Sequence, residues 1–178
     1  MRARLLLVGL LWVAISFGLI FIKEYSLRTG TEVILETLPV DPRELFRGDY
    51  VVLRYKISEF RLNEIKHENI DFVKLKNIYV LLGNKKDNVY FPLEIRSTKP
   101  KNGELFIRGR VNYFSPGYYG SPSTVSLKYG IESFFVPEGK GRELEQYRGK
   151  GLKAKVVLDK NGESILKSLL IDSSEVRF

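Results

Sequence analysis

The sequence predicts a mostly β protein, in which one N-terminal transmembrane helix precedes an antiparallel β-sandwich or barrel-like domain with one or two short helices. An uncharged apolar run near the N-terminus predicts the helix. Beyond it, apolar and polar residues alternate with a period of two, and short turn sequences separate the alternating stretches. Closely spaced strands favour antiparallel over parallel sheets. We therefore expect a cytoplasmic N-terminus and transmembrane anchor over residues 1–23 and an extracytoplasmic β-domain over residues 24–178.

The apolar run covers residues 5–22, and its 18 residues would form a helix about 27 Å long. The hydrocarbon core of a bilayer is about 30 Å thick, so the run is long enough to span it. The main alternative is a cleavable signal peptide, which usually has an apolar run of about 7–15 residues followed by a small-x-small site. Ala14 and Ser16 have that spacing but lie in the middle of the run. We therefore expect an uncleaved anchor that contacts the lipid bilayer through residues 5–22.

Charged residues on both sides of the run predict its orientation. Arg2 and Arg4 precede it, and Lys23, Glu24 and Arg28 follow it. A short basic segment before a single span usually stays in the cytoplasm. We therefore expect a single-pass protein of the cell membrane, with its N-terminus in the cytoplasm and its C-terminal domain outside.

Composition excludes several classes of site. The chain has no Cys and a single His, His67, which excludes disulfides, thiolate metal sites and multi-histidine metal sites. Its 178 residues carry a net charge of +8, but basic and acidic residues are interspersed, so we expect no nucleic-acid partner. The basic excess would suit an anionic lipid surface or envelope polymer, or serve only for solubility.

Alternating or β-branched runs of strand length follow the predicted anchor, and turn sequences separate them. The turn Asp159-Lys160-Asn161-Gly162 joins two such runs and predicts a hairpin. Short helices are expected at residues 58–69, with Ser58 as the N-cap, and at residues 141–147. The predicted strands are residues 31–37, 50–57, 77–82, 89–95, 104–113, 124–129, 133–136, 152–158 and 164–171.

The strongest motif lies within residues 39–55 (PVDPRELFRGDYVVLRY). Its end, GDYVVLRY, resembles the pattern that names the GDYXXLXY family of membrane-anchored proteins and fills every defined position of that pattern. A second block, residues 129–139 (YGIESFFVPEG), is similar to that family's other recognisable block. The resemblance covers nearly the whole chain and implies a single-span anchor carrying an extracytoplasmic domain, often associated with multi-pass membrane proteins. The matching positions are Gly48, Asp49, Tyr50, Leu53 and Tyr55.

Local structure in the first block can be predicted from its residues. Gly48 and Asp49 are typical of a tight turn, because glycine adopts positive φ and aspartate caps backbone N–H groups. Tyr50 would then begin a strand. Tyr55 shares a face with Leu53 and is expected in the core, where its phenol needs a hydrogen-bond partner such as the second block.

On the other face of that strand, Arg54 is available for an ion pair with Glu132 or Glu138 of the second block. We predict that such a pair joins the two blocks. The alternative interpretation is a carboxylate site. In that case converging acidic side chains would hydrolyse a glycoside or bind Ca²⁺. The acidic residues of the two blocks are Asp41, Glu44, Asp49, Glu132 and Glu138.

Residues 115–123 (SPGYYGSPS) form the most loop-like stretch of the sequence. Aromatic residues lie in and around it: Tyr113, Phe114, Tyr118 and Tyr119. Exposed aromatic side chains among Gly, Ser and Pro make good contact surfaces, because they lose little conformational entropy on binding. The other possibility is that these rings fold back over an open end of the β core.

Taken together, these features predict a non-catalytic, membrane-anchored interaction domain, with no catalytic residues, cofactor or metal. We expect it to bind a multi-pass membrane protein or an envelope component. An envelope hydrolase that uses the motif carboxylates is the alternative. A third possibility is a structural subunit assembled through its span, in which Gly9 and Gly18 offer small surfaces for helix packing.

Overall fold

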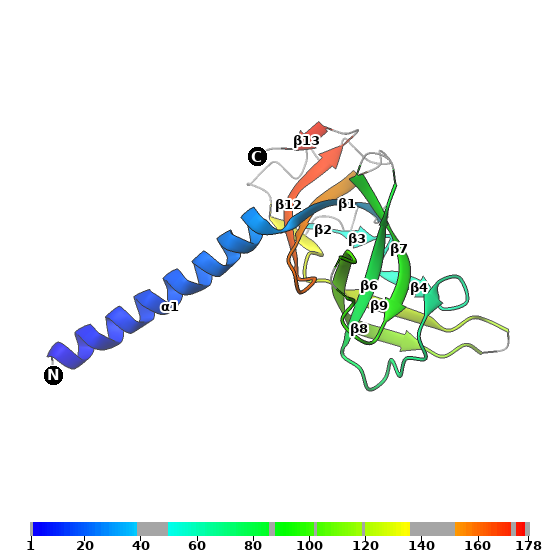
Figure 1. Ribbon diagram of the computed structural model, residues 1–178, viewed down its shortest axis with the longest axis horizontal. Helices are drawn as coiled ribbons and strands as arrows, with labels where there is room; N and C mark the ends of the chain where they lie inside the picture. The colour runs from blue at the N-terminus through cyan, green and yellow to red at the C-terminus, as the bar shows by residue number, and fades with distance from the viewer. Residues whose placement is uncertain are drawn as a thin grey trace.

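The computed structural model describes residues 2–38, 50–85, 88–101, 103–118, 120–135, 152–171 and 174–176. A long N-terminal helix, α1 (Arg2–Thr29), leads directly into a mostly β domain and projects from one side of it (Figure 1). The mostly β prediction with an N-terminal helix is confirmed. Among the described residues, α1 is the only α-helix.

The described side chains of α1 are apolar on every side of the helix, and none of them belongs to the hydrophobic core of the domain. Residues Leu7–Thr29 are long and apolar enough to cross a membrane, and their most apolar window is entirely unburied. Leu10, Trp12 and Phe21, for example, are 67–71% exposed. The helix is therefore not the core helix of a soluble domain. By length and composition it suits a membrane span, and its position near the N-terminus also suits a signal sequence.

Eleven strands form one large mixed sheet, in the order β13-β12-β11-β1-β7-β6-β8-β9-β4 with β3 and β5 beside that path, and β2 pairs separately with β10. The strands are β1 (Thr31–Leu38), β2 (Tyr50–Val52), β3 (Arg54–Tyr55), β4 (Glu59–Arg61), β5 (Lys66–His67), β6 (Asn77–Asn84), β7 (Val89–Arg96), β8 (Phe106–Ser115), β9 (Thr124–Lys128), β10 (Ser133–Phe135), β11 (Leu152–Leu158), β12 (Ser164–Ile171) and β13 (Ser174–Val176).

The large sheet curls because β1 changes its pairing partner along its length. Ile34 and Leu35 pair in parallel with β7, whereas Thr37 and Leu38 pair antiparallel with β3. β4 pairs with β9 at the end of the strand order and follows β3 closely in the chain, so the connection from β3 to β4 brings the sheet back to β1. This barrel-like circuit encloses one hydrophobic core, to which β1, β2, β3, β4, β6, β7, β8, β9, β11 and β12 contribute.

Local turn chemistry placed the closing hairpin correctly: β11 and β12 flank residues 159–163 as predicted. The Asp159 carboxylate accepts hydrogen bonds from the backbone N–H groups of Asn161 and Glu163, both at 2.8 Å. Gly162 has a φ of +76°, a conformation that glycine adopts without a steric penalty. The predicted turn therefore forms for the predicted reasons.

One expectation is wrong. Residues 58–69 do not form a helix but contain β4 and β5, because Phe60 pairs with Val125 of β9 and is buried in the core. The sheet is mainly antiparallel, as expected, but β1 and β5 both pair in parallel with β7. The second expected helix, residues 141–147, lies outside the described residues.

Candidate functional site: two motif blocks and the groove beside them

The two blocks singled out in the sequence lie side by side and pair through their backbones. β2 pairs antiparallel with β10, with Val52 opposite Ser133 and Val51 opposite Phe134. The Leu53 N–H extends this pairing by donating to the Glu132 carbonyl at 2.8 Å. The described parts, residues 50–57 and 129–135, are called the first and second motif blocks below.

Two buried tyrosines cross between the motif blocks in opposite directions. The Tyr55 hydroxyl donates to the Ile131 carbonyl at 2.6 Å, and the Tyr129 hydroxyl donates to the Ile57 carbonyl. Both phenol rings lie in the core, Tyr55 with no exposed surface and Tyr129 with 6%. Burial raises the pKa of each hydroxyl above its ordinary value, and the nearby Glu132 carboxylate raises it further. Both hydroxyls therefore stay protonated and act as permanent donors.

The expected ion pair between Arg54 and Glu132 is not formed among the described residues. The Glu132 carboxylate instead accepts the backbone N–H groups of Tyr129 at 2.6 Å and Gly130 at 3.0 Å, while Arg54 is exposed at its position opposite Leu38. This cap closes a turn in which Gly130 has a φ of +83°. The blocks are thus joined as predicted, but by backbone pairing and two phenols rather than by opposite charges.

Several residues of the predicted site lie outside the described part of the chain. They include all four remaining motif carboxylates together with the turn glycine and one loop tyrosine, and for Tyr50 only the backbone is described. The residues outside are Asp41, Glu44, Gly48, Asp49, Tyr119 and Glu138.

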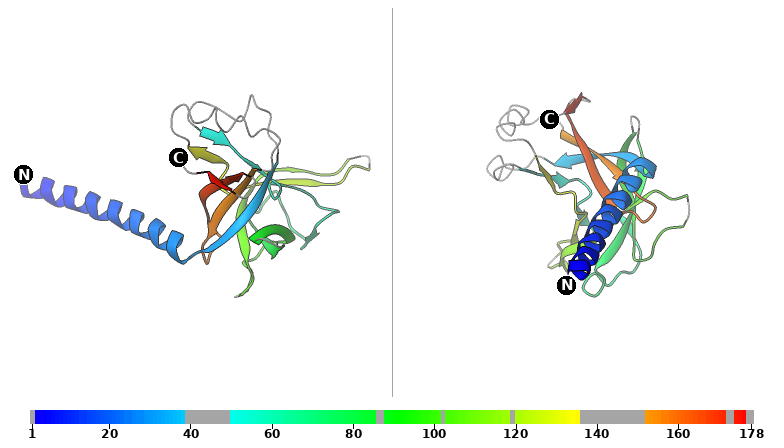
Figure 2. Two further views of the ribbon diagram at one scale, coloured as in Figure 1. Left: turned by 90° about the horizontal axis from the view of Figure 1, so that it is seen from above. Right: turned by 90° about the vertical axis from the view of Figure 1, so that its left-hand side faces the viewer.

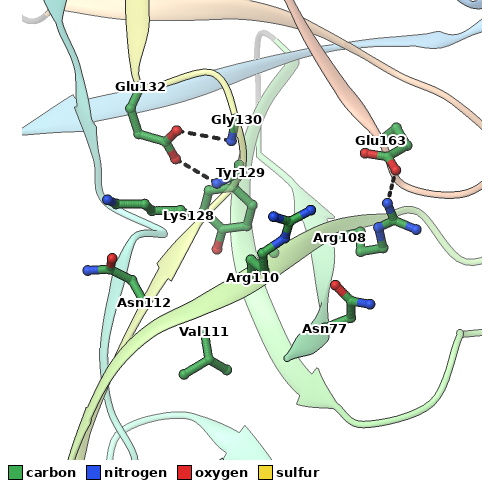
Figure 3. A pocket seen from close by; sticks show the side chains of 11 residues that line it. Asn77, Arg108, Arg110, Val111, Asn112, Lys128, Tyr129, Gly130, Glu132 and Glu163 are labelled. Atoms are coloured by element: carbon green, nitrogen blue, oxygen red, sulfur yellow. Dashed lines mark hydrogen bonds and ion pairs between the residues drawn. The ribbon is translucent and has the colours of Figure 1, made fainter. Parts of the chain in front are cut away.

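A groove of about 420 Å³ opens where the second motif block meets β8 and β9 (Figure 3). Three neighbouring strands meet in it, because Arg110 of β8 lies opposite both Asn77 of β6 and Lys128 of β9. Glu132 and Glu163 also line it. Gly109 leaves room for the Tyr129 ring, since a Cβ at this glycine would lie only 2.9 Å from the ring. The groove was not predicted, because its residues meet only through strand register.

The groove carries an excess of unpaired positive charge. Arg108 forms an ion pair with Glu163, and Glu132 is occupied by the turn that it caps (Figure 3). Arg110 and Lys128 face each other across the β8–β9 pair, and neither forms an ion pair within the described residues. Like charges directly opposite in a sheet are destabilising. The groove therefore suits an acidic contact better than acid–base catalysis.

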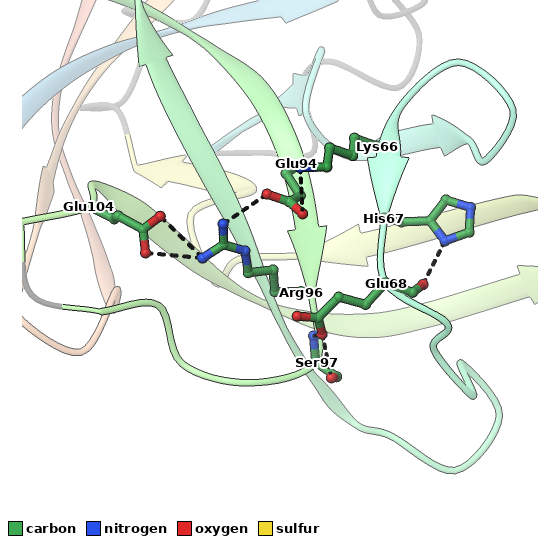
Figure 4. A network of polar contacts seen from close by, with 7 residues as sticks. All are labelled: Lys66, His67, Glu68, Glu94, Arg96, Ser97 and Glu104. Carbon is green, nitrogen blue, oxygen red and sulfur yellow. Dashed lines mark hydrogen bonds and ion pairs between the residues drawn. The ribbon is translucent and has the colours of Figure 1, made fainter.

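A second polar network holds the loop between β7 and β8 in place (Figure 4). Arg96 binds Glu94 at 2.9 Å and Glu104 at 3.0 Å, so it links β7 to the end of the loop. Hydrogen bonding from Arg96 lowers the pKa of the Glu94 carboxyl below its ordinary value. Glu68 accepts both the backbone N–H and the hydroxyl of Ser97 at 2.9 and 2.7 Å. His67 beside it is exposed.

The aromatic stretch forms the loop of the β8–β9 hairpin, and both outcomes expected for its rings occur. Tyr113 and Tyr118 are 60% and 72% exposed. Phe114 instead stacks on Phe72, with ring centroids 5.5 Å apart, and so covers the core. The hairpin extends from the side of the domain opposite to α1 (Figure 2). An interaction surface at its loop would therefore face away from the helix.

The described residues contain no group of three or more His, Asp or Glu side chains that could hold a metal ion. Glu132, the one described carboxylate of the predicted acidic site, has a structural role in the turn.

Comparison with known protein families matches residues 12–169 to the family described as GDYXXLXY protein. Comparison with the curated proteins and with the solved structures gives no match.

Proposed function

The chain belongs to the GDYXXLXY family, and from this premise we propose that it is a membrane-anchored interaction domain that binds a multi-pass membrane protein or another envelope component. α1 would hold the β-domain at the outer surface of the cell membrane, with the N-terminus in the cytoplasm. The exposed aromatic side chains of the β8–β9 hairpin and the basic groove would supply its contact surfaces.

The observation that carries this proposal is the exposure of α1. A helix that presents Leu, Ile, Phe and Trp on all sides, with none of its most apolar window buried, is unfavourable in water and favourable in lipid. The basic residues Arg2 and Arg4 before the helix support a cytoplasmic N-terminus. The position of the hairpin opposite α1 favours a partner whose contact region lies well above the bilayer (Figure 2).

Reporter fusions at Phe178 test the location. We expect a C-terminal alkaline phosphatase to be active and a C-terminal green fluorescent protein to be dark, since each works on only one side of the membrane. Carbonate extraction should leave the chain in the membrane, and its mass should include α1. A mature protein that lacks α1, or a reporter active only in the cytosol, would contradict the proposal.

Site-specific photo-crosslinking in intact cells tests the contact surface. A photoreactive phenylalanine at Tyr118 should give one defined adduct with an envelope protein. The same residue at Val73, which is 80% exposed in the loop between β5 and β6, is the matched control. Equal adducts from both positions would show that the hairpin has no special role.

A further inference from the structure

A second groove, of about 480 Å³, lies where α1 meets the β-domain. Tyr25 and Thr29 line it from the end of the helix, and the loops that follow β7 and β11 line it from the domain. Its lysines come from these two loops and are exposed: Lys99, Lys101 and Lys160.

Within the described part of the chain, no carboxylate forms an ion pair with the lysines of this groove. Lys99 donates to the neutral side-chain oxygen of Asn161 at 2.9 Å, and Lys101 and Lys160 form no ion pair within the described residues. The two carboxylates that line the groove are already occupied. Glu104 binds Arg96 and the Lys101 backbone N–H, and Asp159 caps the β11–β12 turn.

The loop that carries two of these lysines is held in position. Arg96 and Glu104 clamp its end, and Glu68 binds its beginning at Ser97 (Figure 4). A lysine pair on such a loop is presented at a fixed place beside the helix, which lowers the entropy lost when the lysines bind an anion.

The length of α1 sets the height of this groove above a membrane. If residues 5–22 fill the hydrocarbon core, the seven helical residues that follow rise about 10 Å above it. The headgroup layer of one leaflet is about 5–8 Å thick, so Thr29 lies close to its outer boundary. Lysine side chains extend flexibly toward charged groups, and Tyr25 lies lower on the helix, where aromatic residues favour the interface.

We propose that this groove, with Lys99, Lys101 and Lys160, binds the headgroup of an anionic phospholipid. The proposal rests on the anchoring part of the proposed function, because only a membrane-spanning α1 brings the groove to the headgroups. It does not depend on which side of the membrane the domain occupies. The bound lipid would fix the tilt of the domain relative to the bilayer and thereby the direction of the β8–β9 hairpin.

Spin-labelled lipids measure this preference directly. The full chain is reconstituted in phosphatidylcholine vesicles, and the association of spin-labelled phosphatidylglycerol is compared with that of spin-labelled phosphatidylcholine. One lysine near an anionic headgroup contributes about 1 kcal/mol, so we expect a preference of about fivefold or more at low salt. The variant K99Q/K101Q/K160Q should reduce it to about onefold.

The control variant K74Q/K76Q/K85Q removes the same net charge from exposed lysines that line neither groove and should keep the preference. Equal losses in both variants would overturn the proposal in favour of net charge, and a wild-type protein without preference would overturn it outright. Resistance to carbonate extraction, measured on the same samples, reports insertion separately. A chain that fails to insert therefore contradicts the anchor, whereas an inserted chain without lipid preference contradicts only the groove.

Discussion

The tyrosines of the motif blocks and those of the β8–β9 hairpin have opposite environments. Tyr55 and Tyr129 are buried, and each donates a hydrogen bond to a backbone carbonyl of the other block. Tyr113 and Tyr118 are 60% and 72% exposed, and the β8–β9 hairpin that carries them extends away from α1 (Figure 2).

This difference separates the residues that identify the family pattern from those available for binding. The motif ends in a tyrosine because the position needs both a large apolar ring and a donor for a buried carbonyl, two requirements that only a phenol meets well. Among the described residues of the pattern, Leu53 and Tyr55 therefore serve the fold. Contact surfaces are better sought where aromatic or basic side chains are exposed, in the hairpin and the groove.

Removal of the Tyr129 ring should have the largest effect on stability. Tyr129→Ala leaves a cavity beside Gly109 and an unpaired Ile57 carbonyl, so we expect a loss of about 3–5 kcal/mol in the free energy of unfolding. Urea unfolding of the full chain in non-ionic detergent, followed by near-ultraviolet circular dichroism, measures it. Carbonate resistance should not change, because α1 is separate from the core. A loss below about 1 kcal/mol would refute the core role of this ring.

Removal of a single hydroxyl should have a smaller effect. Tyr55→Phe keeps the ring but leaves the Ile131 carbonyl without its donor, so we expect a loss of about 1–3 kcal/mol in the same unfolding assay. Tyr113→Phe, on an exposed side chain, is the matched control and should change stability by less than about 0.5 kcal/mol. Equal effects from the two substitutions would mean that the buried hydrogen bond contributes nothing.

The cap at the start of the second motif block should contribute less still. Glu132→Gln replaces an ionised acceptor of two backbone N–H groups by a neutral one, and we expect a loss of about 1 kcal/mol. Glu64→Gln alters an exposed carboxylate that pairs with Arg61 and provides the comparison. Arg54→Ala should not lower stability as much as Glu132→Gln. Equal losses, with non-additive effects in the double variant, would indicate an ion pair between Arg54 and Glu132 after all.

Features that depend on neighbouring residues could be predicted from the sequence, whereas features that depend on residues far apart in the chain could not. The 159–162 turn and the alternation from Val51 to Ile57 are local, and both were predicted correctly. Residues 58–69 were assigned to a helix because their partner strand, β9, lies far away in the chain. The need of Tyr55 for a partner in the second block followed from burial of a phenol. The partners of Glu132 could not be predicted in this way, because they are backbone N–H groups that only the folded turn leaves without another acceptor.

Acid should weaken the network that holds the β7–β8 loop. The pKa of the Glu94 carboxyl lies below its ordinary value of about 4.3, chiefly because Arg96 donates a hydrogen bond to it. Its contribution to stability is therefore fully present above that value and is lost as the pH falls through the lowered pKa. We expect the hydrogen-exchange protection factors of residues 97–105, which correct for the slower intrinsic exchange of amides in acid, to fall below about pH 4.3, and Glu94→Gln to reduce this pH dependence. Unchanged protection factors at low pH would contradict the clamp.

The smallest effect on stability is expected at the hairpin, where an effect on binding should be largest. Tyr118 is exposed and far from the motif blocks, so Tyr118→Ala should change the free energy of unfolding by less than about 0.5 kcal/mol. The same substitution should weaken the crosslinked adduct formed from a photoreactive residue at Tyr113, because a truncated aromatic contact loses most of its binding energy. Thermal unfolding and adduct yield are measured on the same preparation. Tyr118→Ala is compared with Tyr55→Phe in the same assay: an equal loss of stability with an unchanged adduct would show that the hairpin tyrosine serves the fold. That result would refute the division between tyrosines that stabilise the fold and tyrosines that bind a partner.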